Sequence, residues 1–229
     1  MQWIRIASTV ALSLVLIGAE PVKQPAYLAP DSFDFKTLLG EPPTDCSDAH
    51  KQEIDELLKM QAERTPAEAA RVDAEEKSDA FFFADVMGKD FNAEALPVTA
   101  ELLKKATKRA TVVVNAAKAT FNRNRPYVDE PRLHPSVELE KSKSYPSGHA
   151  ARGMTWGLIL SELYPNDREI LIARGKQYGI DRNIGGVHYP SDVKAGQKLA
   201  AEIFKRMLAD PEFKADLEKA KEECHAVVK

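Results

Sequence analysis

Residues 145–149 read YPSGH, and residues 181–192 read DRNIGGVHYPSD. In the first stretch Pro146 sets a turn and Ser147 is a favourable N-cap, so a helix is predicted to begin there. In the second stretch Pro190 suits the first position of another helix. Each stretch therefore places a histidine beside the amino-terminal end of a predicted helix.

The helix that follows Pro146 presents its amino-terminal end as an anion site. Gly148 permits close approach of the backbone, and the first amides of a helix have no partner within it. His149 projects from the same first turn, beside the expected anion. Taken alone, this pattern is as often a structural helix cap as a functional element.

The second stretch pairs a histidine with a carboxylate. Asp192 lies in the first turn after Pro190, and its side chain can reach back to His188 just outside the helix. A carboxylate on one imidazole nitrogen fixes the tautomer and leaves the other nitrogen as an unprotonated nucleophile. The alternative is a capping interaction with a packed histidine.

Two cations precede these stretches. Lys118 and Arg125 are seven residues apart, which places them on one face if the helix persists. Pro126 disfavours helical geometry at the residue before it, so Arg125 is expected at the helix end. Together the two side chains can hold one dianion, although such a pair is more often a solvated helix face.

The rest of the chain predicts a single all-α domain over residues 46–229. Apart from the apolar trio 112–114 there is no strand-like alternation, and capping residues or prolines mark helix starts near residues 47, 66, 97, 147, 166, 190 and 211. The helix from Pro66 is expected to run to near Gly88. A hydrophobic share of 44% over 229 residues is enough for a real core.

Charge and hydropathy exclude some partners. The net charge of −3 gives no basic excess that would indicate nucleic acid.

Residues 6–19 form a short apolar run after Arg5, which predicts a signal peptide over residues 1–19 rather than an uncleaved anchor. Residues 20–45 are rich in proline and predict an extended arm on the surface. Cys46 and Cys224 predict one disulfide in an exported protein, with two free thiols as the alternative.

Taken together, the order Lys-x6-Arg-Pro, Pro-Ser-Gly-His and Arg-x5-His-x3-Asp resembles one superfamily. It contains type 2 phosphatidic acid phosphatases, bacterial class A non-specific acid phosphatases and vanadium haloperoxidases. Ser144 and Tyr145 before the second motif, the leader and the helical body look like the class A acid phosphatases. The resemblance extends from roughly residue 35 to the carboxyl terminus.

The resemblance implies a role for each motif residue. His188 attacks phosphorus and becomes phosphohistidine, Asp192 orients it, and His149 protonates the leaving alkoxide. The phosphoryl oxygens are bound by Lys118, Arg125, Ser147, Gly148 and Arg182. No metal or other cofactor is implied, since cations and a helix terminus neutralise the phosphoryl charge. The implied protein is a periplasmic or secreted homo-oligomer that has no stable membrane association after the signal peptide is removed. It acts on small phosphate monoesters with broad specificity and a phosphotransferase side activity.

Three positions depart from the family pattern. Asp181 replaces the usual serine before Arg182, where it either pairs with that arginine or points away. Ala150 and Lys143 stand where threonine and glycine are usual. Two other functions use similar residues: a vanadate-dependent haloperoxidase, and a non-catalytic oxyanion-binding protein, against which the retained His149 and His188 argue.

Overall fold

The computed structural model describes residues 25–77 and 79–227, so the predicted signal peptide, residues 1–19, lies outside the described residues. Within the described part every regular element is helical, which confirms the predicted all-α class. The long helices are α2 (Asp48–Glu63), α3 (Pro66–Glu76), α5 (Pro97–Phe121), α7 (Gly148–Leu163), α8 (Arg168–Ile184), α9 (Pro190–Met207) and α10 (Pro211–Val227). The predicted helix starts lie within two residues of these.

Local signals account for the helix starts. Ser47 accepts a hydrogen bond from an amide of the first turn of α2, and Thr65 forms a reciprocal capping box with Glu68 in α3. Ser147 accepts from the Ala150 amide at 3.3 Å and so caps α7. Each bond satisfies an amide that the helix itself leaves without a partner.

The helix that begins at Pro66 is shorter than predicted. It ends at Glu76, and Asp79 then caps a 3₁₀ turn, η3 (Ala80–Phe83), by accepting from the Phe81 amide at 2.9 Å. The short helix α4 (Ala84–Met87) completes the segment before Gly88. An aspartate that captures a nearby amide competes with helix continuation, which explains the break.

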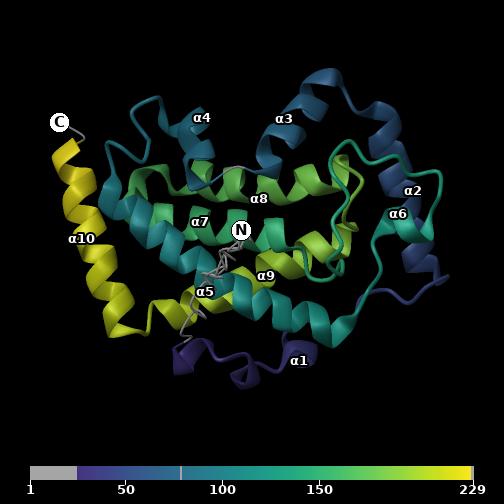
Figure 1. Ribbon diagram of the computed structural model, residues 1–229, viewed down its shortest axis with the longest axis horizontal. Coiled ribbons are helices and arrows are strands. Elements are labelled where there is room, and N and C mark those ends of the chain that lie inside the picture. The colour runs from purple at the N-terminus through teal and green to yellow at the C-terminus, as the bar shows by residue number, and fades with distance from the viewer. Residues whose placement is uncertain (1–24, 78, 228–229) are drawn as a thin grey trace, which may run out of the picture.

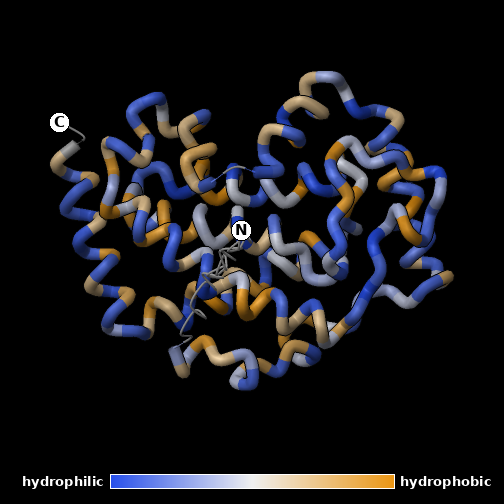
Figure 2. The backbone as a smooth tube through the Cα atoms, in the orientation of Figure 1, coloured by the Kyte–Doolittle hydropathy of each residue, from blue (hydrophilic) through white to orange (hydrophobic). Residues whose placement is uncertain are grey.

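Helix α7 is the centre of the molecule. It packs against α8, α9 and α5, as Figure 1 shows. Trp156, Ile159 and Leu160 are all buried, so the helix is apolar around most of its circumference. In contrast, the outer helix α10 alternates hydrophilic and hydrophobic residues (Figure 2) and buries Phe213 and Leu217 against the core. A helix enclosed on several sides and a helix with one covered face show these two patterns.

Glycines set the close approach of α7 to α8. A Cβ on Gly175 would lie 2.5 Å from the carbonyl oxygen of Gly153, and a Cβ on Gly157 would lie 2.8 Å from that of Leu171. Gly153 and Gly157 are one helical turn apart, as are Gly175 and Gly179. This paired spacing brings the two backbones together, and thereby brings the start of α7 close to the end of α8.

The predicted amino-terminal arm is more structured than expected. From residue 25 onward it forms two 3₁₀ turns, η1 (Ala26–Leu28) and η2 (Pro30–Ser32), and the short helix α1 (Phe35–Leu39). Leu28, Phe33 and Phe35 are buried, and the segment contacts α5 and α9. The apolar side chains hold it to the domain, while its prolines restrict it to short helical turns.

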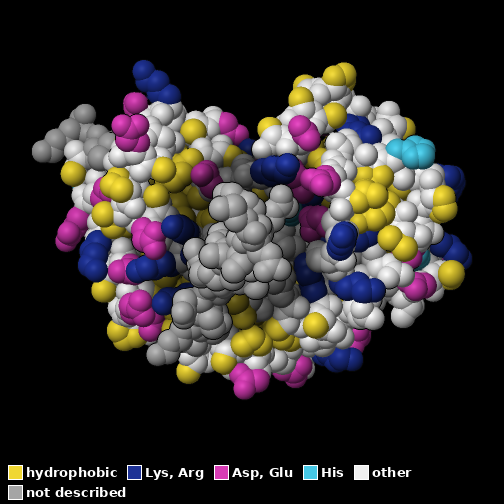
Figure 3. All heavy atoms as spheres, in the orientation of Figure 1, with side chains coloured by type: hydrophobic (Ala, Val, Ile, Leu, Met, Phe, Trp, Pro, Cys, Tyr) yellow, Lys and Arg dark blue, Asp and Glu magenta, His cyan; other side chains and the backbone are white. Residues whose placement is uncertain are grey.

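The predicted disulfide is wrong, because both cysteines are free. Cys46 precedes α2 at the right of Figure 1, whereas Cys224 lies in α10 at the left. Cys224 is buried with its sulfur 3.7 Å from Thr99 Oγ1. Among the described helices, none combines the length and apolarity that a membrane crossing requires. On the face drawn in Figure 3, acidic and basic side chains are interspersed.

Candidate active site

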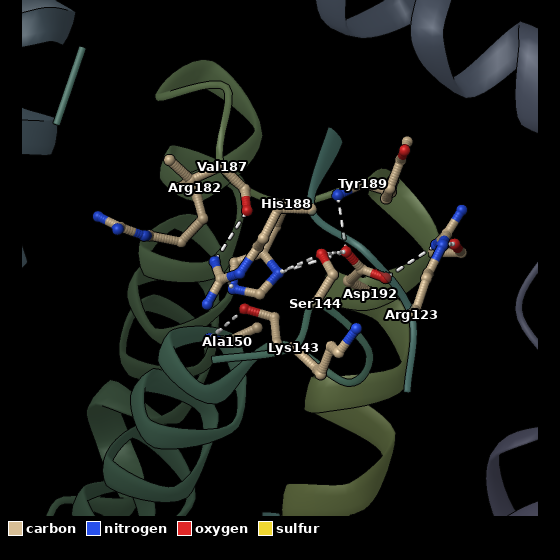
Figure 4. A network of polar contacts seen from close by, with 12 residues as sticks. Arg123, Lys143, Ser144, Ala150, Arg182, Val187, His188, Tyr189 and Asp192 are labelled. Atoms are coloured by element: carbon tan, nitrogen blue, oxygen red, sulfur yellow. Dashed lines mark hydrogen bonds and ion pairs between the residues drawn. The ribbon is translucent and has the colours of Figure 1, made fainter. Parts of the chain in front are cut away.

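Four parts of the chain meet at one site: the end of α5 with the segment after it, the connecting loop (residues 130–147), the start of α7, and the junction of α8 with α9. Figure 4 shows part of this region. The residues predicted to form the site all lie here, namely Lys118, Arg125, Ser147, Gly148, His149, Arg182, His188 and Asp192. Their chemical roles remain predictions.

His188 is almost fully buried, at 1% exposure. Its Nε2 lies 3.0 Å from Arg125 Nη1. Its Nδ1 lies 3.3 Å from both Asp192 Oδ2 and Ser144 Oγ (Figure 4). Because a guanidinium can only donate, Nε2 accepts from Arg125 and the ring proton resides on Nδ1. The imidazole therefore has an unprotonated Nε2 directed at the cations.

Burial and charge keep His188 neutral. Burial is the largest cause that lowers its pKa well below the ordinary value, and Arg125 and Lys118 lower it further. Burial likewise raises the pKa of Asp192, against the opposing effect of Arg123. A neutral imidazole beside a carboxylate held by a cation is a suitable arrangement for a nitrogen nucleophile.

Arg123 binds Asp192, and its place in the site was not predicted from the sequence. Its Nη1 donates to Asp192 Oδ1 at 2.8 Å, and its Nη2 donates to Glu53 Oε2 at 2.8 Å. The guanidinium also lies 3.8 Å from the centroid of the Tyr189 ring. The available signal was its position two residues before Arg125. Its partners come from α2 and α9, which no local pattern connects.

Ser144 is a second residue that sequence reasoning did not assign to the site. Its hydroxyl donates to Asp192 Oδ2 at 2.5 Å, and the Tyr189 amide donates to the same oxygen at 2.8 Å. Asp192 therefore has donors on both carboxylate oxygens. Charge-assisted hydrogen bonds of this kind fix the carboxylate in one orientation toward the imidazole.

Arg125 lies just beyond α5 rather than on it. The chain leaves the helix at Asn122, which has left-handed geometry with φ 52°, and Arg125 precedes the short helix α6 (Pro126–Asp129). Its guanidinium donates to the Ser142 carbonyl at 2.9 Å, the Val187 carbonyl at 2.9 Å and Glu140 Oε2 at 2.7 Å. The connecting loop thus supplies most of its acceptors.

Lys118 contacts the same loop. Its ammonium donates to the carbonyl of Lys143 and, at 3.3 Å, to that of Ser144. Burial, reinforced by Arg125, lowers its pKa to about 8. Lys118 also borders a cavity of 110 Å³ together with Gly148, His149, Glu140 and Arg152. Of the two site histidines, only His149 lines this cavity.

His149 projects from the first turn of α7, as predicted. Its Nδ1 lies 3.5 Å from Glu140 Oε1, and its Nε2 lies 3.4 Å from the Glu76 carbonyl oxygen. Burial, followed by the charges of Arg182 and Arg152, lowers its pKa to about 3. The ring is therefore neutral near pH 7 in the free protein, although the charge of Glu140 acts to raise its pKa.

Arg182 is completely buried and faces two carboxylates. Its Nη2 lies 2.6 Å from Glu76 Oε2 and 3.7 Å from Glu140 Oε1. None of its three guanidinium nitrogens has a well-oriented hydrogen bond within the described part of the chain. A buried guanidinium with undirected donors is suited to bind oxygens that arrive from outside.

Asp181 points away from its neighbour Arg182. Its two carboxylate oxygens accept from Arg71 at 2.8 and 3.0 Å, and Gln177 donates to it at 2.9 Å. The bidentate pair ties α3 to α8. The unusual carboxylate at this position is therefore satisfied by Arg71 and Gln177 rather than by Arg182.

Ser147 and Gly148 form the start of α7. The Ser147 hydroxyl caps the helix, and its amide donates to the Asp192 carbonyl at 2.9 Å, which joins α7 to α9. Gly148 lies against Lys118, whose Cε would be in ordinary van der Waals contact, 3.9 Å, with an added Cβ. The helix end therefore faces the lysine without an intervening side chain.

Two groups within the described residues have the composition of metal sites. They are Asp45, His50 and Asp129, and Glu76, Glu140 and His149. In the second group Arg182 already lies against both carboxylates. A guanidinium at this position opposes a metal cation and favours an anion.

Comparisons with known proteins identify the family of this chain. The family model described as the PAP2 superfamily matches residues 104–210. A non-specific acid phosphatase of Salmonella typhimurium is 32% identical over 217 residues, which cover 91% of this chain and 86% of the relative. An acid phosphatase of Zymomonas mobilis is 34% identical over 145 residues, covering 62% of this chain and 55% of the relative.

Similarity to solved structures is weaker. A transmembrane PAP2-type phosphatidylglycerolphosphate phosphatase from Bacillus subtilis matches with a TM-score of 0.48 and 17% identity, covering 76% of this chain and 89% of that chain. The two Salmonella relatives carry the assignment, because their similarity covers 91% and 88% of this chain. This protein belongs to the non-specific acid phosphatases of the PAP2 superfamily.

Proposed function

We propose that this phosphatase is exported and hydrolyses small phosphate monoesters, without a metal, through a phosphohistidine at His188. The observation that carries the proposal is the tautomer of His188. Arg125 donates to Nε2 at 3.0 Å, while Asp192 lies opposite Nδ1. A ring held in this way directs its lone pair into a cluster of cations, which is where a phosphoryl group would bind.

In the first step, Nε2 of His188 attacks phosphorus. The bond from phosphorus to the leaving oxygen breaks as the nitrogen–phosphorus bond forms, and His149 gives its proton to that oxygen. In the free enzyme, Arg125 donates a hydrogen bond to Nε2 of His188. When substrate binds, Arg125 donates that hydrogen bond to a phosphoryl oxygen instead. Lys118, Arg125 and Arg182 neutralise the equatorial oxygens, with the start of α7 facing the same anion.

In the second step, water attacks the phosphohistidine. His149 accepts the proton of the water and passes it to the departing phosphate. Cleavage of the nitrogen–phosphorus bond thus releases phosphate monoanion and leaves both His188 and His149 neutral. An alcohol that replaces water in this step yields a new phosphate ester, which accounts for a phosphotransferase side activity. General acid–base catalysis of this kind contributes about 10²–10⁴-fold.

The proton on His149 arrives with the substrate. The pKa of about 3 in the free protein leaves the ring neutral at the pH of catalysis. A substrate monoanion that transfers its proton to His149 becomes a dianion, and the resulting ion pair stabilises the charged ring. The productive state therefore holds protonated His149 next to a dianionic phosphoryl group.

The mechanism is tested with p-nitrophenyl phosphate in the presence of a chelator. His188→Ala is expected to abolish turnover, and alkaline quenching followed by mass spectrometry should detect a phosphoryl group on His188 of the wild type. His149→Ala should accumulate this intermediate, because nitrophenolate leaves without a proton whereas water still needs a base. His134→Ala, an exposed histidine of the connecting loop, is the matched control.

Several results would count against the proposal. Full activity of His188→Ala excludes the phosphohistidine, and loss of wild-type activity with the chelator excludes metal independence. Peroxide-dependent halide oxidation with added vanadate would identify a haloperoxidase, and phosphate binding without turnover an oxyanion-binding protein. Export is tested by amino-terminal sequencing of the periplasmic protein, and homo-oligomerisation by light scattering.

A further inference from the structure

A carboxylate of the connecting loop occupies the point where the site cations converge. Glu140 Oε2 accepts from Arg125 Nη2 at 2.7 Å. Its other oxygen, Oε1, lies 3.7 Å from Arg182 Nη2 and 3.5 Å from His149 Nδ1. Glu140 thus contacts two of the three cations and the histidine that the proposed reaction assigns to the phosphoryl group.

The carboxylate is ionised in this position. Burial acts to raise the pKa of Glu140, but the charges around it, with Arg125 the largest, outweigh burial and lower the pKa to about 2. Oε1 is buried and has no hydrogen-bond partner of good geometry within the described residues. Hydrogen bonds from Arg125 and Ser142 therefore hold only Oε2, and Oε1 faces Arg182 and His149 through charge alone.

Neighbouring loop atoms occupy further donors of Arg125 and Lys118. Ser142 accepts from Arg125 through both its carbonyl and its hydroxyl at 2.9 Å, and the Lys143 carbonyl accepts from Lys118. A dianion cannot reach these donors while the loop segment 140–143 stays in place. It would also meet the negative charge of Glu140 at close range, which is strongly unfavourable in a buried site.

We propose that Glu140 is an internal competitor for the phosphate subsite and is displaced when substrate binds. This inference rests on the proposed function for the identity of the subsite. Substrate or product phosphate gains the cations only after Glu140 leaves them, so their apparent affinity is reduced by the fraction of open protein. Return of the carboxylate favours release of phosphate at the end of the cycle.

The test compares wild type with Glu140→Gln and Glu140→Ala by calorimetric titration with inorganic phosphate. Both variants are expected to bind phosphate at least about tenfold more tightly, the factor that corresponds to about 1.4 kcal/mol. For p-nitrophenyl phosphate, KM and the inhibition constant of phosphate should fall, whereas kcat should not rise. Glu138→Gln, an exposed glutamate two residues away, removes the same charge and should change neither value.

A purely structural role of Glu140 gives a different pattern. Under either role, the melting temperature without phosphate should fall in both variants, because Glu140 offsets buried cations. Only the proposed competition predicts that added phosphate raises the melting temperature by more in the variants than in the wild type. Equal or weaker phosphate binding by both variants overturns the inference, as does an equal gain in Glu138→Gln. Phosphate binding needs no turnover, so an inactive wild type whose phosphate affinity still rises in the variants would refute the proposed function alone.

Discussion

Replacement of Arg123 by methionine tests how the site holds its carboxylate. The side chain bridges Asp192 and Glu53 at 2.8 Å each and is itself 6% exposed. Methionine retains much of the volume beside Tyr189 but removes the charge. Two buried carboxylates then lose their shared cation.

The expected cost follows from those contacts. Breaking a buried ion pair by removal of one partner costs about 3–5 kcal/mol. Asp192 keeps bonds from Ser144 and Tyr189, and Glu53 keeps one from the Ser191 amide at 2.7 Å, so the lower end applies. With a urea m-value of about 2 kcal/mol per M, a loss of about 3 kcal/mol lowers the unfolding midpoint by about 1.5 M.

Activity should fall by less than removal of Asp192 itself would cause. Loss of an outer partner that orients a functional side chain costs about 10–100-fold, whereas removal of the carboxylate from a protease triad costs about 10⁴-fold. We therefore expect kcat for p-nitrophenyl phosphate to drop about 10–100-fold in Arg123→Met. Arg132→Met, which removes an exposed arginine, is the control and should leave both activity and the urea midpoint unchanged.

The pH dependence of the stability difference between Arg123→Met and wild type provides an independent test. Burial raises the folded pKa of Asp192, and Arg123 opposes this, so the variant raises the pKa further. A raised carboxyl pKa favours the fold below the unfolded value of 3.8 and loses this benefit as pH rises through the folded pKa. The stability deficit of the variant should therefore be largest near pH 7 and shrink toward pH 4. Unchanged kcat and midpoint at pH 7 would falsify the assigned role of Arg123.

Three further outcomes are expected. Because the proton of His149 arrives with the substrate, kcat/KM should fall above about pH 6, the second pKa of a phosphate monoester. The pH at which kcat/KM begins to fall should shift downward when an ester of lower pKa is used. If that pH is the same for all esters, the argument is contradicted. Arg71→Ala should lower the unfolding free energy by about 2 kcal/mol, since Asp181 loses charge-assisted bonds, and yet retain kcat within about twofold; a large loss of kcat would mean that Asp181 acts on the site. Gly175→Ala should cost about 1–3 kcal/mol in urea unfolding, because the added Cβ meets the Gly153 carbonyl; a neutral effect would show that the α7–α8 contact is loose.

The sequence determined the helices and the identity of the predicted site residues. Ser47, Thr65 and Ser147 each accept from the amide three positions further on, and the prolines act on their own turn, so these signals are readable without tertiary information. The same locality explains why His188 and Asp192, four residues apart across one helix start, were correctly paired. Cys46 and Cys224 had no such local relation, and the predicted bond between them is wrong.

Only the tertiary structure decided the partners of these residues. Asp181 binds Arg71 of α3 rather than the adjacent Arg182, and Arg123 joins α2 to α9. Glu140 reaches the site cations from a loop whose sequence gave no indication of its course. These contacts depend on the packing of α7 against α8 and α9, where glycines let the backbones meet. Charges separated by tens of residues find each other only after that core has formed, so local patterns determine the elements and long-range packing determines which charges pair.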